Sequence, residues 1–394
     1  MKEYTVQLSE QGTIAVDDTI LVKGAQSAAG SRILEGFRSL FSAEAVTRLE
    51  DKGYVISGKT HTGEFGLDLT GEFSYYAEKE EDLKGAAASL VSKGAVKAAL
   101  GVDMNGATRR AAALSGVDFL KPTYGTVSRY GIISCAASGE QMGVYASDVE
   151  GVKEIMEVIA GHDEKDGTSL KTKTYEFSTD MPVAGKKVCI VKELLEKADE
   201  ESRKRVEAFA EKLCKQGVLV EEISCDFFDV ANTTWQILMT AETCNNVSRY
   251  DGVKFGHRAA QYKNIDELYV NTRTEGFNFL TKAVILYGSD VLSKNRYEDC
   301  YGKSLKVRRV VAEKFAELMK NYDAVLTPVC SKTAYTAYEI SEAFETVFRE
   351  SVFTAVANLI GTPALVSSGV QLMGGHFSES ILLSLAGSTE RVGE

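Results

Sequence analysis

The residues best placed to do chemistry follow a short apolar segment near position 100. Leu100–Asp103 has the composition of a strand, and the tight loop Asn105-Gly106-Ala107 comes soon after it. A loop of this kind usually presents a nucleophile or backbone N–H donors to a substrate. Its tip is Ala107, which has no reactive group. The pattern therefore predicts an active-site loop without a nucleophile.

A relocated nucleophile is the first alternative to consider. Thr108 is adjacent to the loop tip, but neighbouring side chains on an extended segment alternate, so it is expected to face away. Ser115 lies further downstream, and Ser89 and Ser92 belong to a segment of small residues with helical spacing. Catalytic groups must be positioned closely against their substrate, which makes these hydroxyls poor replacements.

Metal and disulfide chemistry are not indicated. The seven cysteines are odd in number and form no CxxC pair, which is typical of reduced thiols in a cytoplasmic protein. The four histidines are not spaced as ligand pairs, and His257 is interpreted as a packing or hydrogen-bonding residue. We expect no metal and no cofactor.

The bulk of the sequence is that of a soluble globular protein. Its 394 residues are 44% hydrophobic and carry a net charge of −11, so direct nucleic-acid binding is not expected. The densest basic segment, Lys303–Arg309, has helical spacing and is interpreted as a solvated helix face. The N-terminus has no apolar signal segment, and no stretch of about 18 apolar residues predicts a membrane span.

Strands and helices alternate along much of the chain, and this pattern predicts how the loop is positioned. Such alternation is typical of an α/β fold with helices around a large mixed, mostly parallel sheet. Residues 227–321 are almost wholly helical and are followed by further strands. We therefore expect a single domain over residues 1–394, with a helical insert at about 227–321.

Residues 100–143 resemble the signature segment of the amidase-signature family. Within that family, SRYDGVKFGHR and TRTEGFNFL resemble the helical insert of the A subunits of glutamyl-tRNA(Gln)/aspartyl-tRNA(Asn) amidotransferases, and YDAVLTP resembles their C-terminal strands. The resemblance extends from about Ile20 to Leu385. It implies the family's α/β/α sandwich, and it leaves the family's N-terminal helical region without a counterpart here.

The resemblance also implies a mechanism. In this family one serine attacks the amide carbonyl, a second serine relays protons to a buried lysine, and glycine N–H groups stabilise the oxyanion. Where the family has G-G-S-I-R, this chain has Asn105-Gly106-Ala107-Thr108-Arg109, which places Ala107 at the nucleophile. Counting back places Leu83 at the relay serine.

Three further positions are carried over from the family. The lysine after the first family strand is matched to Lys23, although the family's K-D-N reads Lys23-Gly24-Ala25 here. Arg308 is matched to the arginine that holds the substrate carboxylate, and Ser351 to an acidic group that meets the glutamine amino end. Asn105, Gly106, Thr108, Arg308 and Ser351 are therefore predicted to line the pocket, with Lys23 as a remnant or a pocket cation.

These matches predict a catalytically inactive relative of the amidotransferase A subunits. It would act as a scaffold or regulatory component, with amidotransferase B- or C-like subunits as partners. Two alternatives stay open. One is an active amidase or glutaminase with a relocated nucleophile. The other is a sensor that binds a small carboxylate or amide in the former substrate pocket, through Arg308 and Lys23.

Overall fold

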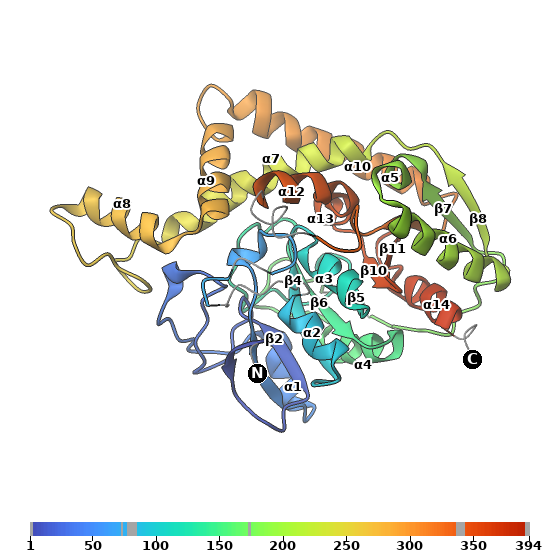
Figure 1. Cartoon of the computed structure of the whole chain (residues 1–394), viewed down its shortest axis with the longest axis horizontal. Coiled ribbons are helices and arrows are strands. Elements are labelled where there is room, and N and C mark those ends of the chain that lie inside the picture. The colour runs from blue at the N-terminus through green and yellow to red at the C-terminus, as the bar shows by residue number, and fades with distance from the viewer. Residues whose placement is uncertain (1–2, 72–73, 77–84, 172–174, 336–342, 391–394) are drawn as a thin grey trace.

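A large sheet forms the centre of the molecule. The computed structural model describes residues 3–71, 74–76, 85–171, 175–335 and 343–390. Its sheet has 11 strands (Figure 1), in the spatial order β1 (Tyr4–Gln7), β3 (Ile56–Thr60), β2 (Ile14–Asp17), β4 (Ala98–Asp103), β6 (Gln141–Ala146), β5 (Asp118–Lys121), β10 (Ala364–Ser367), β11 (Val370–Met373), β9 (Ala324–Pro328), β7 (Lys187–Val191) and β8 (Leu219–Ile223).

The α/β class is confirmed, but the predicted excess of parallel pairs is wrong. The parallel pairs are β2–β3, β2–β4, β7–β8 and β7–β9, and the other six pairs are antiparallel. One cause is a hairpin inside PALVSSGVQLMG, which reads as one strand. Ser368 and Gly369 have φ of 51° and 76°, and positive φ at both turn residues is what a two-residue hairpin favours.

Helices cover both faces of the sheet because strand side chains alternate between two cores. On one face, Val16, Leu100 and Val144 pack in the core that also contains residues of α1 (Glu44–Asp51), α4 (Val149–Ile159), α6 (Glu200–Lys215) and α14 (Glu379–Glu390). The opposite face is covered by α2 (Ala86–Ser92), α3 (Ala107–Ser115), α5 (Lys192–Lys197), α7 (Phe228–Asn246) and α13 (Ala355–Ile360). This arrangement is a three-layer α/β/α sandwich.

The chain between β8 and β9 is helical. It contains α7, α8 (Ile265–Gly276), α9 (Phe279–Val291) and α10 (Lys303–Leu318), and α12 (Ala343–Glu350) follows β9. Figure 1 shows α8 at the end of the molecule opposite β7 and β8. Lys303, Lys306 and Arg309 of the basic segment are exposed on α10.

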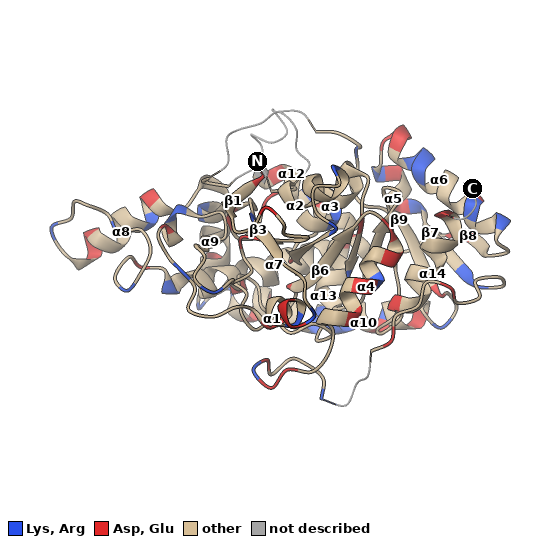
Figure 2. Cartoon of the chain, turned by 90° about the horizontal axis from the view of Figure 1, so that it is seen from below, with Lys and Arg blue, Asp and Glu red and all other residues tan. Residues whose placement is uncertain are grey.

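The surface carries both signs of charge. Figure 2 shows acidic and basic residues together on α6 and on α8. Of the helices that the structure describes, none combines the length and the apolar character that a membrane span requires. Among the same residues, no three His, Cys, Asp or Glu side chains are grouped so that they could hold a metal ion.

Candidate active site

Three neighbouring strands end at the place where the site forms. β2 is parallel to both β3 and β4, so the carboxyl ends of these strands meet at one edge of the sheet. Asp17 is the last residue of β2, His61 follows β3, and Val102 is near the end of β4. In open α/β sheets, ligands bind at the carboxyl ends of the strands. This edge is therefore the part of the sheet where a binding site is expected.

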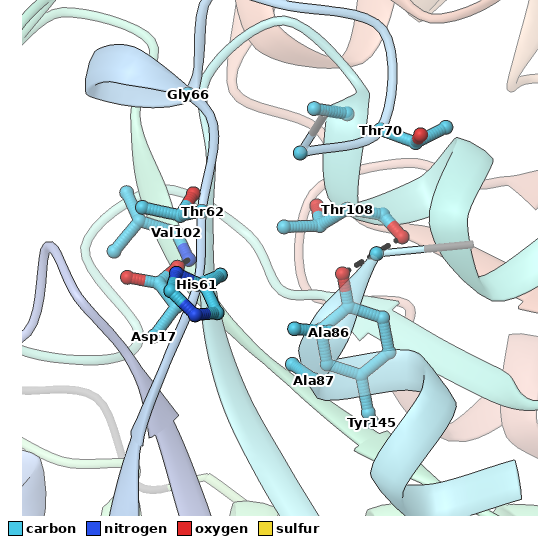
Figure 3. Close-up of a pocket in the computed structure, with 13 residues that line it drawn as sticks. Asp17, His61, Thr62, Gly66, Thr70, Ala86, Ala87, Val102, Thr108 and Tyr145 are labelled. Atoms are coloured by element: carbon cyan, nitrogen blue, oxygen red, sulfur yellow. Dashed lines mark hydrogen bonds between the residues drawn. The ribbon is translucent and has the colours of Figure 1, made fainter. Parts of the chain in front are cut away.

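A small cavity lies between these strand ends and the first turns of α2 and α3. It has a volume of about 30 Å³ and is lined by Asp17, His61, Thr62, Gly66, Thr70, Gly71, Gly85, Ala86, Ala87, Val102, Ala107, Thr108 and Tyr145. In Figure 3, Asp17, His61 and Thr62 lie on one side, and Thr108, Ala86 and Tyr145 on the other. The lining of the cavity thus includes Ala107 together with residues at the ends of β2 and β3.

The loop before α3 keeps a conformation that glycine permits. Gly106 has φ of +81°, and a Cβ added there would lie 2.4 Å from Cβ and Oγ1 of the buried Thr354. The glycine therefore serves both a left-handed backbone and a close approach to its neighbour. This contact fixes the start of α3, and with it the position of Ala107.

Substituting Gly106 with alanine is expected to lower the free energy of unfolding by about 2–5 kcal/mol, the sum of backbone strain and overpacking. Gly116→Ala is the matched control, because Gly116 has φ of +68° at the other end of α3 but open space around the added Cβ. Urea unfolding of both variants would measure the difference. Equal losses in the two variants would show that Thr354 imposes no restriction.

Asp17 is a buried carboxylate with three donors. Its side chain accepts hydrogen bonds from the Thr19 N–H at 2.8 Å, the Thr19 hydroxyl, and the Val102 N–H at 2.8 Å. The residue is 5% exposed. Burial raises the pKa of Asp17, and the hydrogen bonds and nearby Lys59 only partly oppose this effect.

Lys59 and His61 complete this side of the site. The Lys59 Nζ lies 3.0 Å from Asp18 Oδ1, and both side chains are almost fully buried. Nζ also donates to the Ser27 hydroxyl. Burial lowers the pKa of Lys59, and Asp18 opposes the shift. Burial also lowers the pKa of His61, which favours its neutral form at pH 7.

Asp103, at the end of β4, anchors the helix on the other side. It accepts two hydrogen bonds from Arg109, at 3.0 Å each, and one from the Thr108 hydroxyl at 2.5 Å. Burial alone would raise the pKa of Asp103, but the charge and hydrogen bonds of Arg109, together with those of Thr108 and Asn358, hold it far below its usual range. Asp103 is therefore a fixed anion and a poor proton acceptor.

The structure brings together most of the residues predicted around the loop. Ala107 and Thr108 line the cavity, and Gly106 precedes them. The expectation that Thr108 faces away from Ala107 is wrong, because α3 begins at Ala107 and the alternation of an extended segment does not apply.

Asn105 and Ser351 also meet, although neither is among the described residues that line the cavity. The Ser351 Oγ lies 3.1 Å from Asn105 Oδ1 and 2.7 Å from the Val347 carbonyl oxygen. A hydroxyl has one hydrogen, which the nearer carbonyl accepts. Turning the Asn105 amide end for end would let Nδ2, a buried group with no partner among the described residues, donate to Ser351.

Two predicted pocket residues lie elsewhere. Lys23 is exposed and is not among the described residues that line the cavity; its backbone N–H donates to the Ser42 hydroxyl at 3.1 Å. Lys23 lies six residues beyond Asp17, where β2 ends. Arg308 donates to the Ser138 carbonyl at 3.1 Å from α10, and it too is absent from the cavity lining. Leu83 falls outside the described residues.

The sequence interpretation missed Asp17, His61 and Tyr145. A usable signal was present, since polar residues directly after parallel strands converge at one sheet edge. Tyr145 is the last but one residue of β6, a strand that the pattern did not predict, and its hydroxyl donates to the Thr108 carbonyl at 3.0 Å.

Comparison with known proteins places the chain in a family. A family model described as Amidase matches residues 13–383. The A subunit of the glutamyl-tRNA(Gln) amidotransferase of Koribacter versatilis is 34% identical over 399 residues, covering 96% of this chain and 83% of that protein. The protein of the same name from Thermotoga maritima is also 34% identical, with 96% and 83% coverage.

A solved structure agrees with these matches. The crystal structure of the Thermotoga maritima protein, the A subunit of its glutamyl-tRNA(Gln) amidotransferase, superimposes with a TM-score of 0.81 at 29% identity, covering 98% of this chain and 86% of that one. The sheet and its flanking helices are thus shared over most of both molecules. The chain belongs to the amidase-signature family.

Proposed function

We propose that this protein is a catalytically inactive relative of the amidotransferase A subunits and that it serves as a scaffold or regulatory component. The observation that carries the proposal is Ala107, which occupies the family's nucleophile position, begins α3 and lines the cavity. A methyl group cannot attack an amide carbonyl, and covalent catalysis requires an activated nucleophile. The pocket is kept while its reactive group is missing.

We infer that Asp17, and not Lys23, stands at the family's lysine. Asp17 ends β2 and is followed by Asp18, which matches the second residue of the family's K-D-N, whereas Lys23 is followed by glycine. The group that accepts protons in the family would then be a carboxylate here. Together with Ala107 and Leu83, this makes three changes at the positions that carry the reaction.

A relocated nucleophile has little support from the geometry. Thr108 lines the cavity, but its hydroxyl is bound to Asp103, a carboxylate whose pKa is held too low for a general base. Ser115 is the last residue of α3, about 12 Å along the helix axis from Ala107 at 1.5 Å per residue. The Thr108 hydroxyl therefore has no suitable base in Asp103, and Ser115 is too far along α3 to replace the residue at Ala107.

The helical block supports the scaffold role. A groove of about 340 Å³ between α8 and α9 is lined by Tyr269, Val270, Arg273, Thr274, Phe277, Lys282, Ile285 and Leu286. Val270 and Leu286 are 62% and 72% exposed, and nearby Phe279 is 73% exposed. Exposed apolar groups gathered in this way mark protein interaction sites. The relatives named above are subunits of an amidotransferase.

Mixing the full chain with B- and C-like amidotransferase subunits from the same organism is expected to give a complex that co-elutes in size-exclusion chromatography. Leu286→Glu should weaken the complex at least tenfold, because a charge would be buried in an apolar interface. Leu219→Glu is the matched control, since Leu219 is 57% exposed on β8, at the other end of the molecule. Separate elution of all components would contradict the scaffold role. Equal weakening of the complex by both variants would show that the groove between α8 and α9 is not the surface that binds the partner subunits.

A further inference from the structure

We propose that two copies of this chain associate through α8, with the two helices antiparallel and related by a two-fold axis near Val270. Each copy would place its α8 in the groove that α8 and α9 of the other copy form. The inference goes beyond the proposed function, because it concerns the chain without any amidotransferase subunit. The groove is also the proposed surface for those subunits, so the two associations would exclude each other.

One side of α8 is exposed and apolar at its centre. The groove residues of this helix recur at intervals of three or four positions, which places them on one side of it: Tyr269, Val270, Arg273, Thr274 and Phe277. Asp266 lies one turn before Val270 on the same side. Val270 is 62% exposed, and Leu286, which lines the groove from α9, is 72% exposed. A second copy that covers these side chains would remove their apolar surface from water.

The charges along α8 complement those of a reversed copy. The first turn of the helix is acidic, with Asp266 and Glu267, and its last turn carries Arg273. Lys282 of α9 lies beside this basic end and also lines the groove. Among the ion pairs of the described residues, none includes any of these four side chains. An antiparallel second α8 would bring the acidic end of each helix to the basic end of the other.

The position of the two-fold axis follows from the spacing of these charges. With the axis at Val270, Asp266 of one copy lies opposite Thr274 of the other, because each is four residues from the axis. The Lys282 Nζ donates to the Thr274 carbonyl oxygen at 2.9 Å, so each Asp266 would meet a Lys282. The acidic residue after Asp266 lies opposite Arg273 in the same way. The two Val270 side chains then meet at the centre of the contact.

The place of α8 in the fold leaves this side open to a second copy. Figures 1 and 2 both show α8 at one end of the molecule, with no other labelled helix or strand beyond it. Its inner side packs closely on its own chain, since a Cβ added at Gly276 would lie 2.5 Å from Ile33 Cδ1. Two helices and the flanks of α9 make a small interface, so we expect weak association, with a Kd of about 10–100 μM.

Sedimentation velocity of the full chain alone, at concentrations from about 1 to about 300 μM, tests the proposal. We expect a reversible equilibrium between monomer and dimer. Val270→Glu should weaken the dimer at least tenfold, because it places two like charges beside the two-fold axis. Leu219→Glu is the matched control and should leave the dimer intact, since Leu219 is 57% exposed on β8, at the other end of the molecule.

Exchanging the charges tests the antiparallel pairing. Asp266→Lys and Lys282→Glu should each weaken self-association about tenfold, because each puts two like-charged pairs into the symmetric contact. An equimolar mixture of these two variants should dimerise as the unmodified chain does, since both pairs in the mixed dimer again carry opposite charges. A chain that stays monomeric over the whole range, a dimer unaffected by Val270→Glu, or a mixture that stays monomeric would overturn the proposal. These outcomes leave the scaffold role standing, because that role is tested with the partner subunits present.

Discussion

Replacing Arg109 with methionine is expected to lower the free energy of unfolding by about 3–5 kcal/mol, because it leaves a buried charge without a partner. Arg109 is fully buried and binds both oxygens of Asp103 at 3.0 Å. It also donates to Gln371 Oε1 at 2.7 Å and to the Thr354 carbonyl at 3.1 Å. One side chain thus connects β4, α3, β11 and the segment before α13.

Chemical denaturation of matched variants would measure this effect. Arg205→Met is the control: Arg205 lies on α6, its side chain is 35% exposed and it pairs with Glu201 at 4.0 Å, so its loss should cost at most about 1 kcal/mol. The double variant Asp103→Leu, Arg109→Met should be more stable than Arg109→Met alone, because no unpaired charge remains. A loss below about 1 kcal/mol for Arg109→Met would show that the pair does not stabilise the site.

The Asp103–Arg109 ion pair also predicts how the free energy of unfolding depends on pH. The pKa of folded Asp103 lies below its unfolded value, so the unfolded state binds a proton first as the pH falls. The stabilisation is complete above the unfolded pKa of about 3.9 and is lost as the pH falls toward the folded pKa. The stability of Arg109→Met should therefore fall less steeply below about pH 4.

Restoring the serines is expected to leave the rate of amide hydrolysis at background. Loss of the nucleophile or its base in a triad enzyme costs about 10⁶ in rate, and the losses act as a unit. In Ala107→Ser, and in Ala107→Ser combined with Leu83→Ser, a hydroxyl would return to the start of α3, but it would face Asp17 in place of a lysine. Ammonia release from glutamine measures the outcome.

Turnover by the double variant would mean that a base remains. Adding Asp17→Asn or Lys23→Ala to that variant would then identify it. Loss of turnover only with Lys23→Ala would contradict the assignment of Asp17 to the lysine position. Loss only with Asp17→Asn would show that a carboxylate can serve as the base in this fold.

Local patterns predicted the strand and the loop before Ala107, because spacing and glycine placement are visible in sequence. The helix α3, which begins at Ala107, was not predicted. The residues that contact that loop were harder to predict from the sequence. Asp17 and Ala107 are 90 positions apart in the sequence, and only the parallel pairing of β2 with β4 brings them to one edge. Lys23 was chosen by residue type near the expected strand, although the strand ends six residues earlier.

The directions of the strands were also not predicted correctly from the sequence. β6 lies between β4 and β5 and is antiparallel to both, an order that local periodicity does not encode. The prediction for Thr108 failed because it assumed an extended segment, whereas Thr108 lies in the first turn of α3, where the alternation of a strand does not apply. Ser351 was matched from the resemblance, and it does meet Asn105.

Measuring ammonia release tests the central claim, which is that this member of the amidase-signature family does not hydrolyse amides. The unmodified protein, Thr108→Ala and Ser115→Ala would each be incubated with glutamine, asparagine and a simple amide. We expect the same background rate for all three proteins. Steady turnover of glutamine by the unmodified protein, abolished in Thr108→Ala and kept in Ser115→Ala, would contradict the loss of catalysis and identify Thr108 as the nucleophile.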